Sequence, residues 1–261
     1  MASLVYLCAR PQSGAAAAEY ESFRTAMRLG EEELARWNLV NDELPQDFAV
    51  RWRGAVVGGS PFNVSDPESA KTDTQRRVES DLARLARAAA AGETAALFTC
   101  YGIGVASRAL GGEVSRAYPE DTGPTTIELT DAGRADPIFG ALAQRFTALT
   151  AHKEGTSRLP DGAVLLASGG GCPGEGRPEQ GSPEQGSPEQ GCPVQAYRVG
   201  DRLYAAQFHP EPTARAFTQR MAVYRDDGYF AASDYDTIAA RVFAASLSEP
   251  PRILRAFARA F

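Results

Sequence analysis

Three residues near predicted strand ends carry the side chains best suited to chemistry in this sequence of 261 residues. Cys100 follows an apolar run that begins at Ala95, and a segment compatible with a helix comes next. A cysteine at such a strand-to-helix turn lies beside backbone N–H groups that favour the nucleophilic thiolate. His209 and Glu211 follow another apolar run. Histidine can accept the thiol proton and a nearby carboxylate can fix its tautomer, so the three residues predict a nucleophilic cysteine site.

Glycines beside these residues indicate where the backbone comes close to other groups. Gly102 follows Cys100 by two positions, where a side chain would crowd the junction of strand and helix. Gly58 and Gly59 end a predicted strand at 54–57, where adjacent glycines allow unusual backbone angles that point N–H groups at a ligand. The alternatives are an ordinary glycine turn for the pair and a buried core cysteine for Cys100. A structural role is the alternative for the histidine.

The predicted elements that position these residues alternate along the chain. Short apolar runs predict strands at 3–8, 37–40, 54–57, 95–99, 125–130, 146–150, 163–167, 194–199 and 202–208. Apolar residues at helical spacing predict helices at 15–29, 73–91, 105–110 and 252–261, and a short helix that starts at 136–139. The order of strand and helix up to residue 110 predicts a parallel sheet with helices on both faces. The later strands predict an antiparallel edge.

Composition sets the expected domain boundaries. Residues 1–212 are expected to form one α/β domain, interrupted at 172–192 by a low-complexity loop in which Pro-Glu-Gln-Gly occurs three times. Its Pro, Gly, Gln and Glu residues cannot build a core. Residues 213–261 predict a C-terminal helical extension packed on the same domain. A disulfide between Cys172 and Cys192 is not expected in a reducing compartment.

Charge and hydropathy argue against several classes of function. A net charge of −6 gives no basic surface for nucleic acid. No apolar run is long enough for a membrane span, and the run at 4–8 is too short for a signal peptide, so we expect a cytoplasmic protein. The four cysteines and two histidines lack the spacing of a zinc site, and no complete phosphate-binding or dinucleotide-binding loop is present. We therefore expect no metal and no cofactor.

Three motifs in order resemble those of class I glutamine amidotransferases, in particular the glutaminase part of GMP synthase. They are Gly58-Gly59-Ser60-Pro61, Cys100-Tyr101-Gly102 and His209-Pro210-Glu211. Leaving out residues 173–192 shortens the separation of Cys100 and His209 from 109 to 89 residues, which is close to the usual spacing in such domains. We therefore interpret the repeat as an insertion in a domain that otherwise has the usual spacing of its motifs.

This resemblance implies a flavodoxin-like fold and hydrolysis of the side-chain amide of glutamine through an acyl-enzyme on Cys100. His209 is then the base and Glu211 the group that orients it. Backbone N–H groups of Gly59 and Tyr101 are the implied oxyanion hole. The ammonia is expected to pass to an acceptor on a separate synthetase or ligase chain.

The resemblance also implies residues that bind glutamine or a related small amide. They are Gly58, Ser60, Gly104, His152 and Glu154. The last two lie in Ala151-His152-Lys153-Glu154, which resembles a substrate-side segment of the family, and the alternative for this segment is an exposed loop.

The sequence departs from the family pattern at two positions. Phe98, two residues before Cys100, stands where the family usually has glycine, and Gly104 stands where it usually has glutamine. Gly104 motivates an alternative function, a stand-alone hydrolase acting on another γ-glutamyl or amide substrate. Phe98 motivates a second alternative, a regulatory subunit that retains the fold without catalysis.

Overall fold

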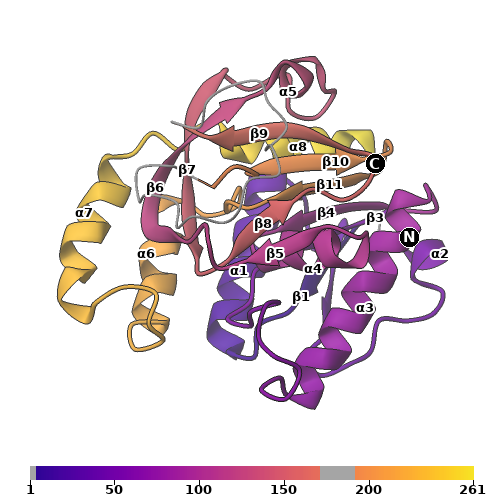
Figure 1. The fold of residues 1–261 in the computed structure, drawn as a ribbon, viewed down its shortest axis with the longest axis horizontal. Helices are drawn as coiled ribbons and strands as arrows, with labels where there is room; N and C mark the ends of the chain where they lie inside the picture. The colour runs from indigo at the N-terminus through magenta and orange to yellow at the C-terminus, as the bar shows by residue number, and fades with distance from the viewer. Residues whose placement is uncertain (1–3, 171–191) are drawn as a thin grey trace.

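A computed structural model describes residues 4–170 and 192–261 (Figure 1). The repeat expected to form an inserted loop lies outside the described residues, as does Cys172. Within the described ranges, no helix is long and apolar enough to cross a membrane.

The described residues form strands and helices that alternate along much of the chain. The strands are β1 (Leu4–Cys8), β2 (Leu34–Asn38), β3 (Gly54–Val57), β4 (Ala95–Thr99), β5 (Glu113–Ser115), β6 (Glu120–Leu129), β7 (Arg145–His152), β8 (Gly155–Arg158), β9 (Ala163–Gly169), β10 (Ala196–Val199) and β11 (Leu203–Ala206). The helices are α1 (Ser13–Met27), α2 (Phe48–Arg51), α3 (Asp73–Ala90), α4 (Tyr101–Ala109), α5 (Asp131–Ala135), α6 (Ala214–Val223), the 3-10 turn η1 (Ala232–Asp234), α7 (Tyr235–Ala244) and α8 (Pro250–Ala260).

Nine strands form one sheet in the order β2-β1-β3-β4-β11-β10-β9-β6-β7, and β5 pairs with β8 in a separate small sheet. The first five strands of this order are parallel. The remaining four pair antiparallel. The strand order that starts β2-β1-β3-β4 is that of flavodoxin-like sheets. The predicted fold class, with antiparallel strands along one side, is therefore confirmed.

Four of the five parallel strands, β1, β3, β4 and β11, are buried on both faces, which explains their unbroken apolar runs, whereas the edge strand β2 is partly exposed. Leu4 and Tyr6 of β1 point into a core shared with α1 and α8. Val5 and Leu7 point into a second core shared with α3 and α4. Helices thus cover both faces of the sheet.

The C-terminal helices pack on this domain. Thr213 caps α6 by accepting the Ala216 N–H at 3.2 Å, and Phe217 and Met221 bury one face of the helix. Helix α7 contacts β6 (Figure 1), and α8 contacts α1. The division of the chain at residue 212 stays a prediction.

Three predicted boundaries are wrong for local reasons. The helix expected at 105–110 begins at Tyr101, immediately after Cys100. The helix expected to start at 136–139 is a single turn: the Asp136 carboxylate accepts the N–H groups of Ile138 and Phe139, and the Gly140 N–H donates to Asp136 O at 2.8 Å, but the chain does not continue as a helix. The strand expected at 37–40 lies at Leu34–Asn38, where it pairs in parallel with β1.

Two phenylalanines in the C-terminal helices test this packing. Phe257 of α8 is fully buried, whereas Phe243 of α7 is 61% exposed. Replacing Phe257 by Ala is expected to lower the free energy of unfolding by about 3–5 kcal/mol, because a large core side chain is lost. Phe243→Ala, the matched control, is expected to change it by less than about 0.5 kcal/mol. Urea denaturation followed by circular dichroism measures both, and equal losses would contradict the packing of α8.

Candidate active site

The carboxyl ends of the parallel strands bring together residues that lie far apart in the sequence. Arg10 follows β1, Gly59 follows β3, Cys100 follows β4 and His209 follows β11. Because these strands are parallel, all four residues lie at the same edge of the sheet. In open α/β sheets, this edge is where ligands bind.

Cys100 has an unusual backbone conformation between β4 and α4. Its φ is 51° and its ψ is −109°. Among the described residues, Arg28 is the one other non-glycine residue with a positive φ. The Cys100 N–H donates to Ala206 O at 2.9 Å, which ties the turn to β11. Such strain persists only where the surrounding structure maintains it, and it is frequent at functional sites.

Phe98 fits this turn because Gly102 makes room for it. Phe98 is fully buried in the core beneath α4. A Cβ on Gly102 would lie 3.2 Å from Phe98 Cβ and 3.2 Å from Val57 Cγ1. The predicted crowding at Gly102 is therefore real, and its causes are Phe98 on β4 and Val57 on β3.

His209 lies beside Cys100 and Glu211. Its backbone N–H donates to Leu149 O of β7 at 2.8 Å, and its Nδ1 lies 3.1 Å from Glu211 Oε1. A Cβ on Gly59 would lie 3.0 Å from His209 Cε1 and 3.5 Å from Cys100 Cβ. The structure therefore brings the three predicted catalytic residues together, with Nε2 as the ring nitrogen not bound to Glu211.

Charge interactions in this group are strong. Burial opposes the charged imidazolium, but the Cys100 and Glu211 side chains outweigh it and raise the pKa of His209 from 6.5 to about 9. Burial also opposes ionisation of Glu211, yet His209 and Arg220 hold the pKa of this carboxyl at about 2. The arrangement favours a protonated His209 ring paired with the Glu211 carboxylate.

A pocket opens beside Cys100. Six of the predicted site residues line it: Ser60, Cys100, Tyr101, Gly104, His152 and Glu154. Gly58, Gly59, His209 and Glu211 are not among its lining residues. Four of the five predicted substrate-side residues thus share one pocket with Cys100, while the His-Glu pair is buried.

His152 and Glu154 are buried, so the alternative of an exposed loop is wrong. The His152 ring binds Glu154 O through Nδ1 at 2.8 Å and Glu120 Oε2 through Nε2 at 2.6 Å. The Glu154 carboxylate accepts the N–H groups of Val64 and Ser65 at 2.6 and 2.9 Å. Both side chains hold the pocket walls in place, and their contact with a substrate stays a prediction.

Gly58 and Gly59 are needed for close approach rather than for unusual backbone angles, since neither has positive φ. A Cβ on Gly58 would collide with the Glu19 carboxylate. The Gly59 N–H donates to Glu19 Oε1 at 3.2 Å, so an oxyanion could use this donor only by replacing that bond. The first-turn N–H of Tyr101 lacks an acceptor within its helix, as at any helix start. Both oxyanion-hole assignments stay predictions.

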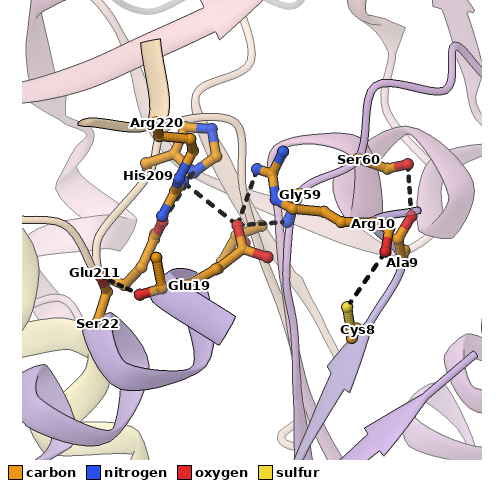
Figure 2. A network of polar contacts seen from close by, with 12 residues as sticks. Cys8, Ala9, Arg10, Glu19, Ser22, Gly59, Ser60, His209, Glu211 and Arg220 are labelled. Atoms are coloured by element: carbon orange, nitrogen blue, oxygen red, sulfur yellow. Dashed lines mark hydrogen bonds and ion pairs between the residues drawn. The ribbon is translucent and has the colours of Figure 1, made fainter. Parts of the chain in front are cut away.

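Several residues of the site were missed by sequence reasoning. Arg10, Glu19 and Arg220 form a buried network around Glu211 (Figure 2). Glu19 could have been found from the sequence, because it is a charged residue on the same face of α1 as the buried Phe23. Gln207 and Tyr229 also line the pocket. Tyr229 lies in the loop after α6 and had no recognisable signal.

Ligand atoms of Glu19, His209 and Glu211 lie within 4.8 Å of one another, a spacing that could suit a metal ion. Arg220 Nη1 already lies between the carboxylates, 3.3 Å from Glu19 Oε1 and 2.8 Å from Glu211 Oε1. A guanidinium supplies the positive charge there, so we interpret the group as an ion-pair network.

No family model matches the chain. A stretch of 112 residues, 43% of the chain, is 30% identical to the glutamine-hydrolyzing GMP synthase of Aeropyrum pernix and spans 17% of that protein. A glutamine amidotransferase structure from Thermotoga maritima superposes with a TM-score of 0.67 at 15% identity, covering 98% of this chain and 96% of that one. A second, from Methylobacillus flagellatus, gives 0.65 at 16% identity, covering 98% and 92%.

The chain has the fold of the class I glutamine amidotransferases. In this amidotransferase fold, the candidate site occupies the carboxyl edge of the parallel strands, which agrees with the resemblance seen in the three sequence motifs.

The protonation of His209 can be measured directly because the amidotransferase-like chain has two histidines. Nuclear magnetic resonance of isotope-labelled histidine is expected to show an imidazole that titrates near pH 9 and is absent in His209→Gln. Because this pKa is raised, the protonated ring stabilises the fold fully below pH 6.5, and the stabilisation is lost as pH rises through about 9. In Cys100→Ala the midpoint should fall. A wild-type midpoint at or below 6.5 would contradict the described electrostatics.

Proposed function

We propose that this chain is a class I glutamine amidotransferase that releases ammonia from the side chain of glutamine. The observation that carries the proposal is the convergence of a strained Cys100 with a buried His209–Glu211 pair beside a pocket. This arrangement suits covalent hydrolysis of an amide, in which a cysteine attacks the carbonyl and a histidine transfers protons.

In the first step, the Cys100 thiol proton passes to His209 and Sγ attacks the side-chain amide carbon of glutamine. The C–N bond then breaks as the leaving nitrogen takes a proton from His209, giving ammonia and a γ-glutamyl thioester. In the second step, His209 accepts a proton from water as the water attacks the thioester. The C–S bond breaks, glutamate leaves and the thiol is restored, so glutamine and water yield glutamate and ammonia.

Glu211 keeps Nδ1 of His209 protonated and leaves Nε2 for the reacting groups, because it binds Nδ1 at 3.1 Å. The oxyanion formed in each step needs nearby N–H donors, each of which is worth about 10²–10³ in rate. Tyr101 N–H at the start of α4 and Gly59 N–H are the proposed donors. No metal or cofactor takes part in the proposed chemistry.

A separate synthetase or ligase is the proposed destination of the ammonia. The similarity to a GMP synthase that hydrolyses glutamine supports this, although the matched stretch spans 17% of that protein. A glutaminase paired with a synthetase acts on small molecules, so we propose neither a nucleic acid nor a membrane partner. In this proposal the chain works in the cytoplasm.

Gly104 favours a second candidate, hydrolysis of a different γ-glutamyl or amide compound. It lines the pocket without a side chain, and a Cβ there would lie 3.2 Å from Val64 Cγ2. A glutamine side chain at this position would narrow the pocket, so its absence permits a substrate with a larger group.

Labelling by a diazo-ketone analogue of glutamine tests the proposal. We expect the wild-type chain to be alkylated at Cys100, with free glutamine protecting it, and the site mapped by mass spectrometry. His209→Gln is expected to slow the labelling by about a hundredfold or more, because the proton acceptor is lost. Cys8→Ser is the control that keeps full labelling, since Cys8 is buried in the sheet away from the pocket.

Labelling of Cys100 no faster than that of Cys8 would contradict the catalytic proposal and favour a regulatory subunit. Protection by other γ-glutamyl compounds, with glutamine ineffective, would support the second candidate.

A further inference from the structure

A chain of buried charges continues from Glu211 to elements distant in the sequence. Arg220 of α6 donates from Nη1 to Glu211 Oε1 at 2.8 Å and lies 3.3 Å from Glu19 Oε1 of α1. Glu19 Oε1 also accepts from Arg10 Nη2 at 2.9 Å and from the Gly59 N–H. Figure 2 shows Glu19 between Arg10, the Gly59 backbone and the His209–Arg220 pair. All four charged side chains are buried.

The position of the Glu211 carboxylate depends on this network. Its Oε1 contacts both His209 Nδ1 and Arg220 Nη1, whereas its Oε2 has no hydrogen-bond partner among the described residues. The two contacts to Oε1 therefore hold the carboxylate in place. The long side chain of Arg220 has many rotamers, and its contact with Glu19 helps to hold the guanidinium beside Glu211.

The four charges cancel, because two arginines face two glutamates. An uncompensated buried charge is strongly unfavourable, so the loss of one partner must act on the neighbouring groups that can change their charge. His209 is one of them, because its Nδ1 lies 3.4 Å from Arg220 Nη1. The guanidinium opposes protonation of the ring, and Glu19 offsets the guanidinium.

We propose that Arg220 and Glu19 are positioning residues of the site. Arg220 holds the Glu211 carboxylate against His209, and Glu19 holds and neutralises Arg220 while it fixes the Gly58–Gly59 turn. The effect of these two residues on catalysis rests on the proposed function. Neither residue touches the pocket, so each acts through its neighbours.

Other titratable groups surround this network, and none of them is replaced in the variants described below. Those that face it from the packed elements are Cys100 before α4, Tyr6 and Cys8 on β1, and Tyr224 and Tyr229 after α6. Tyr6 donates to Glu19 Oε2 at 2.6 Å, and Arg10 donates to the Tyr224 hydroxyl at 2.9 Å.

Variants that change one charge at a time give opposite predictions. Glu19→Gln leaves one positive charge in excess and is expected to lower the titration midpoint of His209 by about one pH unit or more. Arg220→Gln leaves one negative charge in excess and is expected to raise this midpoint. The double variant is neutral again, so its midpoint should return to within about half a unit of the wild type.

The labelling rate of Cys100 supplies a second readout. Arg220→Gln is expected to slow labelling by about tenfold or more, because the Glu211 carboxylate stays beside the ring but is no longer held in one orientation, and Arg220→Lys should restore part of the rate. Arg215→Gln on the exposed face of α6 and Glu21→Gln on α1 are matched controls that leave both readouts unchanged.

Midpoints that do not move, or that move in the same direction in both single variants, would overturn the inference. Failure of the proposed function gives a different result from failure of this inference. In that case the midpoints shift in opposite directions as predicted, whereas wild-type Cys100 is not labelled.

Discussion

The contact between His209 and Glu211 is the interaction on which the site depends. Both side chains are buried at the carboxyl edge of the sheet, where two charged groups must compensate one another and be compensated in turn. Helix α1 contributes Glu19 and helix α6 contributes Arg220, so two helices separated by most of the chain are joined through one charge network. Helix α6 is thus part of the site as well as of the packing.

A second constraint acts on Cys100. Its backbone is held in a conformation that non-glycine residues rarely adopt, between a strand buried on both faces and a helix that starts at the next residue. The hydrogen bond to Ala206 and the packing of Phe98 against Gly102 maintain that conformation. Strain of this kind is stored where the surrounding structure can support it, here by two cores on opposite faces of the sheet.

The parallel strands and the three ordered motifs could be predicted from sequence because their signals are local. Strands covered on both faces read as continuous apolar runs, and Cys100, His209 and Glu211 follow such runs directly. The charge network could not be predicted in the same way, because Glu19 and Arg220 meet only through the tertiary fold. The sequence pattern assigned Gly58 and Gly59 to unusual backbone angles, whereas their neighbours Glu19, Arg10 and His209 are the reason a side chain does not fit.

The most direct test of the proposed chemistry is to trap the covalent intermediate. The chain would be mixed with glutamine, quenched with acid within the first turnovers, digested, and analysed by mass spectrometry for a γ-glutamyl group on the peptide that contains Cys100. The account predicts this adduct in the wild type, its absence in Cys100→Ala, and its loss with time as water completes the reaction. Release of ammonia from glutamine without any adduct on Cys100, or with the same yield in Cys100→Ala, would contradict it.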